Sequence, residues 1–145
     1  MTIRVLLADD HVVVRRLLRG LIEDGSGCAV CGEAADGAEA VRLAEGLNPD
    51  VVVLDISMPK MGGFEAAQRI RMRSPATPVL MITIDDTEQS VRLALAAGAR
   101  GYIVKSEAGE HLKAAVLALA QTGQPYFTPQ LTPVMWAGHT SGQLT

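Results

Sequence analysis

Short apolar runs alternate with amphipathic stretches along the chain, and this alternation predicts its fold. Five runs rich in Val, Ile, Leu and Ala have the length of β-strands; they are Ile3–Ala8, Cys28–Ala34, Val51–Asp55, Val79–Thr83 and Gly101–Val104. The third run opens with four consecutive apolar residues, three of them β-branched, which is typical of a strand buried on both faces. The second run contains Gly32 and Glu33, and these residues favour a strand at the edge of a sheet.

The stretch after the first run has the periodicity of a helix. Its apolar residues recur at i, i+3, i+4, i+7 and i+8 and form one stripe; they are Val14, Leu17, Leu18, Leu21 and Ile22. Three arginines lie off this stripe, and we expect them to point into water. They are Arg15, Arg16 and Arg19. The pair Asp24-Gly25 is a helix stop signal, so the helix is predicted to end there.

The same reasoning predicts a helix after each of the other runs. These helices lie at about 40–44, 64–72, 87–98 and 107–121. The helix that follows the fourth run starts near Asp86 or Thr87, since both are good N-cap residues. Strict alternation of strands and helices indicates an α/β fold, with a doubly wound parallel sheet and helices on both faces.

The stretch 122–145 differs in composition from the rest. It contains three prolines and three glycines, at positions 125, 129, 133 and 123, 138, 142, so it cannot form a long helix. We expect a linker with at most one short helical piece around 134–136. The predicted organisation is one domain at 1–121, followed by a tail at 122–145.

Composition narrows the class of protein. The chain of 145 residues is 48% hydrophobic but only 3% aromatic, which favours an aliphatic core under helices over an aromatic-rich β-sandwich. Its net charge of −3 makes the chain itself a poor binder of nucleic acid. No apolar run approaches the roughly 18 residues of a membrane span. A strand is predicted within a few residues of the N-terminus, so we expect no signal peptide and a cytoplasmic location.

Cys28 and Cys31 have the C-x-x-C spacing of redox and metal motifs. They lie in a predicted strand, where positions i and i+3 point to opposite faces. A redox pair of this spacing requires a helix N-terminus. We therefore expect neither a redox nor a metal role for these cysteines.

Polar residues gather where the predicted strands end. The first strand is followed by Asp9 and Asp10, the third ends in Asp55, the fourth in Thr83, and the fifth precedes Lys105. Taken alone, Asp55 could be a turn or helix-capping residue. The carboxyl ends of parallel strands lie along one edge of the sheet, where open α/β sheets bind their ligands. Three carboxylates, an ammonium and a hydroxyl are therefore expected to converge there.

This set of groups suits metal-assisted phosphoryl transfer. Clustered carboxylates repel one another, and a divalent cation relieves the repulsion. All-oxygen ligands favour Mg²⁺, and no His/Cys cluster suggests zinc. One carboxylate can attack phosphorus while the metal, Lys105 and Thr83 stabilise the charge on the phosphoryl oxygens.

With these residues the chain resembles the receiver domain of two-component response regulators. The resemblance covers about residues 1–121 and implies a flavodoxin-like (βα)5 fold with strand order 2-1-3-4-5. It depends on five anchors in the correct order: Asp9-Asp10, Asp55 followed by Met58-Pro59, Gly62-Gly63, Thr83, and Gly101-Tyr102-Ile103-Val104-Lys105.

The resemblance implies a role for each residue of the site. Asp55 corresponds to the phosphoacceptor, with Lys105 paired to it and then to the phosphoryl group. Asp10 corresponds to the direct Mg²⁺ ligand, with Asp9 acting nearby through water. The backbone carbonyl of Ser57 completes the protein ligands.

The resemblance also implies a switch and partners. Thr83 would hydrogen-bond a phosphoryl oxygen, and Tyr102 would turn inward when Thr83 moves. The alternative for Tyr102 is an ordinary half-exposed aromatic. The face built from the fourth helix, fifth strand and fifth helix would then change. The implied partners are a histidine kinase and, through that face or through the first and fifth helices, a second receiver.

Two segments resemble the NarL/LuxR branch of the family. They are Asp9-Asp10-His11 and Gly123-Gln124-Pro125-Tyr126-Phe127. Members of this branch usually carry a C-terminal helix-turn-helix domain, which is not in this sequence, and DNA would be bound only through it. We expect the chain to be a truncated form of a transcription regulator.

Three residues depart from the family pattern or lie beside it. Ile84 is bulky where relatives usually have a small residue, so we expect slow phosphorylation by small donors and slow hydrolysis. Ser106 follows Lys105 where many relatives have proline, and the geometry of that peptide bond stays open. His11 is expected in a loop at the rim of the site, without a proton-transfer role.

Other functions remain as alternatives. A metal-dependent phosphohydrolase would use Asp55 as nucleophile, but such enzymes want a second acid two residues on, and Ser57 stands there. A degenerate receiver that acts only as an interaction module would lack the acceptor, a metal acid or the lysine, and none is missing. A flavodoxin would need a hydroxyl-rich phosphate loop after the first strand.

Overall fold

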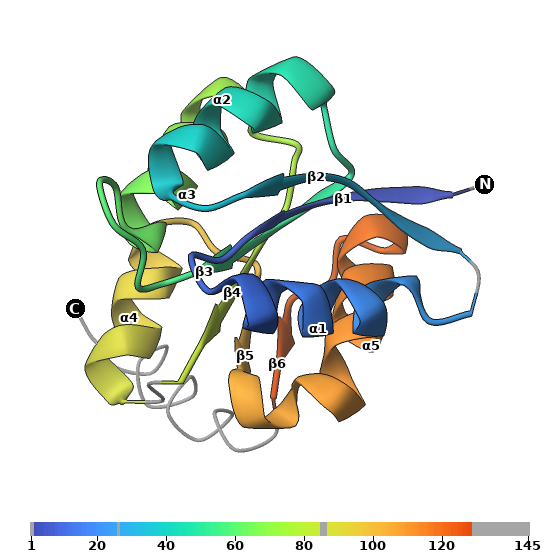
Figure 1. The fold of residues 1–145 in the computed structure, drawn as a ribbon. Helices are drawn as coiled ribbons and strands as arrows, with labels where there is room; N and C mark the ends of the chain where they lie inside the picture. Colours follow the sequence, from blue (N-terminus) through green and yellow to red (C-terminus); the bar gives the residue numbers. More distant parts are fainter. Residues whose placement is uncertain (1, 26, 85–86, 129–145) are drawn as a thin grey trace.

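A parallel sheet with helices on both faces makes up the part of the chain that the computed structural model describes, residues 2–25, 27–84 and 87–128 (Figure 1). Within these residues the sheet has six strands in the order β2-β1-β3-β4-β5-β6, all paired in parallel. The strands are β1 (Ile3–Ala8), β2 (Cys28–Ala34), β3 (Val51–Asp55), β4 (Val79–Thr83), β5 (Gly101–Val104) and β6 (Tyr126–Phe127). The flavodoxin-like order 2-1-3-4-5 and the edge position of β2 are confirmed.

The helices follow the predicted order with small differences at their ends. They are α1 (Val12–Glu23), α2 (Gly37–Leu47), α3 (Gly63–Arg73), α4 (Glu88–Ala96), the short 3-10 helix η1 (Lys105–Glu107) and α5 (Ala108–Gln121). Thr87 is the N-cap of α4, and its side chain accepts a hydrogen bond from the Ser90 amide. The other candidate cap, Asp86, lies outside the described residues, as does the predicted helical piece at 134–136.

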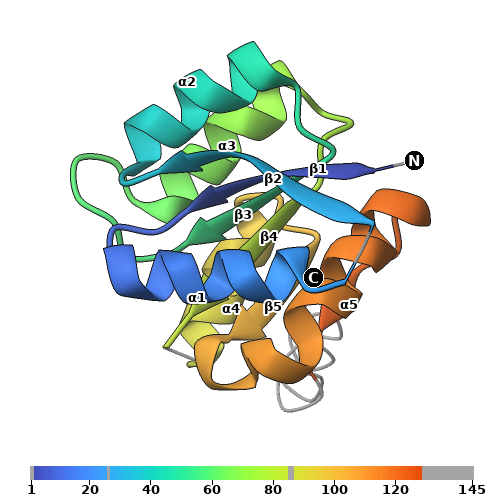
Figure 2. The same cartoon turned by 45° about the vertical axis from the view of Figure 1, so that its right-hand side comes forward.

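Side chains at alternate positions of the central strands belong to two separate cores, one on each face of the sheet. One core lies under α2, α3 and α4 and takes Leu6, Val52, Met81 and Tyr102 from successive strands. The other lies under α1 and α5, and Figure 2 shows these two helices together on one side of the sheet. Strands β3 and β4 are buried at every position, as expected for strands covered on both faces.

The prediction for α1 is partly wrong. Leu18 and Ile22 are buried, but Leu17 is 65% exposed. Conversely, the side chain of Arg15 is only 17% exposed, because its guanidinium pairs with Glu33 of β2 instead of pointing into water. A helical stripe of five apolar positions is wider than the contact that the helix makes with the sheet, and a carboxylate on the edge strand attracts the neighbouring arginines.

The stretch after α5 also differs from the prediction, because β6 extends the sheet where only a linker was expected. The Tyr126 amide donates to the Arg100 carbonyl and the Thr128 amide to the Tyr102 carbonyl, at 3.0 and 3.2 Å. The free edge of β5 is a row of unpaired backbone groups, and a short extended segment satisfies them. The sheet therefore includes a segment beyond residue 121.

No helix within the described residues is both long and apolar enough to span a bilayer.

Candidate functional site

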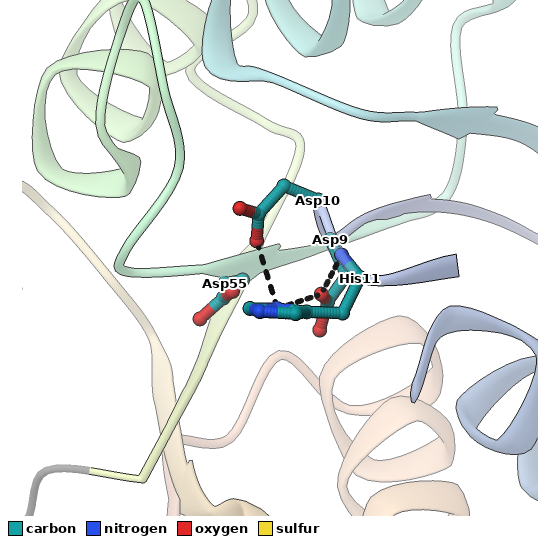
Figure 3. A group of neighbouring side chains, drawn as sticks. All are labelled: Asp9, Asp10, His11 and Asp55. Carbon is teal, nitrogen blue, oxygen red and sulfur yellow. Dashed lines mark hydrogen bonds and ion pairs between the residues drawn. The ribbon is translucent and has the colours of Figure 1, made fainter. Parts of the chain in front are cut away.

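The three predicted acids meet at the carboxyl edge of the sheet. Asp9 and Asp10 follow β1, Asp55 ends β3, and these strands are neighbours in the sheet. Figure 3 shows their side chains converging together with that of His11. One ligand atom from each of these four residues lies within 4.8 Å of the others. The geometry thus brings Asp55 together with acids that lie 45 and 46 residues earlier in the sequence.

Asp9 is fully buried and holds the end of β1 in place. Its Oδ1 accepts the His11 amide at 2.8 Å, and its backbone carbonyl accepts a hydrogen bond from Arg15 Nη1 at 2.7 Å. Its Oδ2 lies 2.9 Å from Lys105 Nζ. A buried carboxylate needs such partners, and here they fix the turn from β1 into α1.

Lys105 bridges two carboxylates. Its Nζ lies 3.3 Å from Asp55 Oδ2 as well as 2.9 Å from Asp9. Burial alone would lower the pKa of the Lys105 ammonium, but the hydrogen bonds and charges of Asp9 and Asp55 outweigh it and raise this pKa. The lysine is therefore a fixed positive charge in the site.

Asp55 is 3% exposed, and its environment disfavours its negative charge. Burial raises the pKa of the Asp55 carboxyl, the charge of Asp9 adds to the rise, and Lys105 opposes it. The Ser57 amide gives only a long contact of 3.4 Å to Asp55 Oδ1. The carboxylate is thus held in place but incompletely neutralised, which suits a group that gains by binding a cation or by reacting.

The loop after Asp55 requires glycine at one position. A Cβ on Gly63 would lie 2.4 Å from the Asp55 carbonyl oxygen, closer than any side chain tolerates. The Gly63 amide donates to the Ile56 carbonyl at 2.9 Å, so the loop closes tightly on the end of β3. The pair Gly62-Gly63 therefore lets α3 begin directly beside the candidate acceptor.

The two residues predicted to sense the site are both buried. Thr83 ends β4 next to β3 and is buried, and Tyr102 is fully buried in the core under α4. The Tyr102 hydroxyl donates to Ser90 Oγ at 2.9 Å. The alternative of a half-exposed tyrosine is wrong, and sequence reasoning did not identify Ser90 as its partner.

The acids form a donor set that fits a hard divalent cation. Asp10 Oδ1 is buried and has no hydrogen bond within the described part of the chain, although His11 Nδ1 lies 3.1 Å away. A buried carboxylate oxygen without a hydrogen-bond donor is the kind of atom that a metal ion satisfies. Asp10 and Asp55 would supply carboxylate oxygens, with Asp9 beside them.

The remaining predicted residues lie at the rim. Ser57 is exposed, and its carbonyl stays a predicted ligand. Ile84 is 82% exposed, so it does not pack over the acids, and its effect on phosphorylation stays a prediction. His11 is exposed, but its ring lies nearer the acids than expected, at 3.1 Å from Asp10 and 3.5 Å from Asp9. The Lys105–Ser106 bond is trans, as are the other peptide bonds in the described segments.

Arg15 contacts the site, and sequence reasoning missed this contact. It contacts the Asp9 carbonyl and Glu33 at once, and so connects the site to the edge of the sheet. The signal was available, because Arg15 lies one helical turn after His11 at the start of α1.

The two cysteines are both unpaired, and burial raises the pKa of each thiol.

Comparison with known proteins agrees with this geometry. Residues 5–117 match the family described as the response regulator receiver domain. The chain is 35% identical over 141 residues to the nitrate/nitrite response regulator NarL of Escherichia coli K12, covering 97% of this chain and 65% of NarL. It is 40% identical over 119 residues to the Bacillus subtilis regulator YxjL, covering 82% and 55% of the two chains.

A solved structure is similar over nearly its whole length. It is a LuxR-family two-component response regulator from Aurantimonas sp. SI85-9A1, 36% identical, with a TM-score of 0.89 and coverage of 97% of this chain and 99% of that one. The chain spans about 55–65% of the length of the two curated relatives named above. The chain thus belongs to the response regulator receiver domain family, in its NarL/LuxR branch.

Proposed function

We propose that this chain accepts a phosphoryl group from a histidine kinase on Asp55 and passes the change on to an output domain. One observation carries the proposal: Asp55 is buried at the end of β3 beside two further acids, with Lys105 Nζ 3.3 Å away. Family membership supports signalling by phosphorylation, and the site supplies the groups that this chemistry requires.

The chemical step is an exchange of bonds at phosphorus. An Asp55 carboxylate oxygen forms the new bond while the bond from phosphorus to the imidazole nitrogen of the donor histidine breaks. The leaving nitrogen keeps the electron pair and takes a proton. The product is an acyl phosphate on Asp55 and a neutral histidine on the kinase.

The residues around Asp55 divide the stabilisation of charge. Lys105, bridging Asp9 and Asp55, would shift toward the phosphoryl oxygens, and the Thr83 hydroxyl would hydrogen-bond one of them. Mg²⁺, held by Asp10, Asp55 and the Ser57 carbonyl with Asp9 acting through water, would neutralise the charge of the acids and the phosphoryl group. The raised pKa of Asp55 is consistent with an acid that needs such a cation.

The output would be a population shift. An acyl phosphate adds negative charge at Asp55, and Thr83 at the end of β4 would move toward it. Tyr102 and α4 lie next to β4, so they would respond to this movement. A shift from 1:99 to 99:1 requires about 5.5 kcal/mol of preference for one state.

The wider role follows from the relatives. NarL is named as a nitrate/nitrite response regulator, and this chain matches 65% of its length. We infer that DNA is bound through a C-terminal helix-turn-helix domain in a longer protein, that phosphorylated receivers pair, and that the protein acts on transcription in the cytoplasm.

Intact mass spectrometry tests the central claim. After incubation with acetyl phosphate and Mg²⁺, the chain should gain the mass of one phosphoryl group, and peptide mapping should place it on Asp55. Asp55→Asn should gain none, while Asp24→Asn, at the exposed aspartate that caps the C-terminal end of α1, should behave as the parent. Chelation of Mg²⁺ should abolish the gain.

Two results would contradict the proposal. A phosphoryl group that persists in Asp55→Asn would place the acceptor elsewhere. Repeated turnover of a phosphomonoester would instead indicate a phosphohydrolase.

A further inference from the structure

The strand β6 changes the face on which output was expected. That face was predicted from α4, β5 and α5, with β5 at the edge of the sheet. Instead β6 occupies the outer edge of β5, beside α5 (Figure 1). A partner that approached this edge would therefore meet β6, and the backbone groups of β5 would already be paired.

Tyr102 is held from two sides at once. Its side chain donates to Ser90 Oγ of α4 at 2.9 Å, and its backbone carbonyl accepts from the Thr128 amide at 3.2 Å. Tyr102 also pairs in register with Phe127 of β6. Register partners in neighbouring strands have side chains on the same face, and both residues belong to the core under α4. An outward rotation of Tyr102 would remove the side chain of the in-register neighbour of Phe127 from this core.

The other side of β6 is fastened to α5. The Tyr126 hydroxyl lies 2.8 Å from His111 Nδ1, and the two rings are tilted by 57° at a centroid distance of 6.0 Å. Arg100 Nη2 donates to the Gly123 carbonyl at 2.6 Å, which brings the end of α5 back toward β5. These contacts position the segment, but none of them is an ion pair.

The docked position of β6 also carries a cost. The strand is two residues long, and both residues are only partly buried. Thr128 is fully buried, yet its hydroxyl has no hydrogen-bond partner among the described residues. A buried hydroxyl without a partner opposes docking. The balance between docked and released β6 is therefore one that a modest change at Tyr102 can shift.

We propose that residues 126–128 form a reversible strap that docks on β5 when Tyr102 lies inward and loosens when Tyr102 leaves. This proposal rests on the proposed function, because phosphorylation of Asp55 is what would strengthen the inward position. The strap leads directly into the tail at 129–145. Through the edge of the sheet, the strap would couple phosphorylation of Asp55 to the residues that follow Thr128 in the chain.

Amide hydrogen exchange of the full 145-residue chain tests the coupling without phosphorylation. Ser90→Ala removes the hydroxyl that accepts the hydrogen bond from Tyr102. Ser90 lies on α4, so the substitution does not change β6 itself. We expect the Tyr126 and Thr128 amides to exchange about fivefold faster, the equivalent of one lost hydrogen bond. Asp36→Ala is the control, since it removes the N-cap of α2 at the opposite side of the sheet and should leave these amides unchanged.

The same amides should respond to the phosphoryl group. With acetyl phosphate and Mg²⁺ they should exchange more slowly than in the unmodified chain, and in Asp55→Asn they should not change. Tyr126→Phe, which removes the contact with His111 but keeps the ring, should speed their exchange in both states.

The two proposals fail in different ways. No mass gain on Asp55 would overturn the proposed function, and Ser90→Ala would still test the strap. The strap is overturned if Ser90→Ala and Asp36→Ala have the same effect on β6. It is also overturned if Asp55 becomes phosphorylated while the exchange of β6 amides stays constant.

Discussion

The two edges of the sheet are held in different ways. At the β2 edge, Arg15 Nε and Arg19 Nη1 both donate to Glu33, at 2.8 and 2.6 Å. Arg19 and the Val30 amide also donate to Glu23, at 3.1 and 2.9 Å. At the other edge a two-residue strand is held by backbone hydrogen bonds and one His–Tyr contact, and Arg100 Nη2 donates to the Gly123 carbonyl just before this strand.

The difference matches the position of the site. Charge-assisted hydrogen bonds are about twice as strong as neutral ones, so the edge that Arg15 connects to Asp9 is firmly fastened. The edge beside Tyr102 has one such bond in the segment before β6, from Arg100 to the Gly123 carbonyl, while β6 itself is held by backbone hydrogen bonds and the Tyr126 hydroxyl. A switch needs a firm support for its reacting groups and a movable element to report the change. This receiver has the first at β2 and the second at β6.

The largest expected effect is at the firm edge. Glu33→Ala leaves the partly buried Arg15 guanidinium without its carboxylate and removes one of the two carboxylate partners of Arg19, so it should lower the free energy of unfolding by about 1–3 kcal/mol. The midpoint of urea denaturation measures this. Glu45→Ala, which removes an exposed pair with Arg73, is the matched control and should cost at most about 1 kcal/mol. Equal losses in the two variants would remove the distinction between the edges.

The opposite sign is expected at the site. Asp55→Asn removes a carboxylate whose charge is disfavoured by burial and by Asp9, so the variant should be more stable than the parent at neutral pH without Mg²⁺. Thermal denaturation of the two proteins checks this. A less stable Asp55→Asn would mean that the ion pair with Lys105 outweighs the cost of burial.

The dependence of stability on pH should differ between the glutamates at the β2 edge and Asp55 in the site. Arg15 first, then Arg19, holds the pKa of the Glu33 carboxyl below its ordinary value of 4.5. The Val30 amide first, then Arg19, does the same for Glu23. The unfolded chain therefore binds protons more readily at these groups. Their contribution is complete above pH 4.5 and is lost as pH falls through the lowered pKa values.

Asp55 behaves in the opposite way. The pKa of Asp55 in the folded state is above the ordinary 3.8. The destabilisation caused by its buried charge is therefore absent below pH 3.8 and grows as pH rises through the raised pKa. Urea midpoints between about pH 3 and pH 7 should show the advantage of Asp55→Asn appearing as pH rises. Over the same rise in pH, Glu33→Gln should become less stable than the parent. Parallel curves for the two variants would contradict these assignments.

The smallest effect is expected at the weaker edge. Tyr126→Phe removes one neutral hydrogen bond from a strand that can open locally, so the global free energy of unfolding should fall by at most about 1 kcal/mol. Tyr102→Phe is the comparison, because it leaves the buried Ser90 hydroxyl without its partner and should cost more. Calorimetry of both variants gives the order.

Much of the fold could be predicted because its signals are local. Five strands have the predicted bounds, since runs such as Val51–Asp55 can be buried only in the middle of a covered sheet. The two-residue strand β6 could not be predicted from its own residues. Tyr126 and Phe127 are extended because the edge of β5 is free, and that edge exists only after the sheet has formed.

The site shows the same division. Residues at strand ends could be assigned because parallel strands bring their carboxyl ends to one edge, which places Asp9, Asp10 and Asp55 together. Contacts between side chains that reach across different elements could not be assigned in this way. Ser90 meets Tyr102 and Arg15 meets Glu33 across different elements, and no periodicity in the sequence marks either pair.

The sequence alone therefore determined the order of strands and helices, the layers and the acids that meet at the carboxyl edge, because hydrophobic period and strand direction are written residue by residue. Tertiary structure alone decided which arginines leave the water, where Tyr102 points and that the segment after α5 joins the sheet. Each of these depends on a partner that folding brings near from a distant part of the chain, and the free energy of such a contact exists only once both partners are in place.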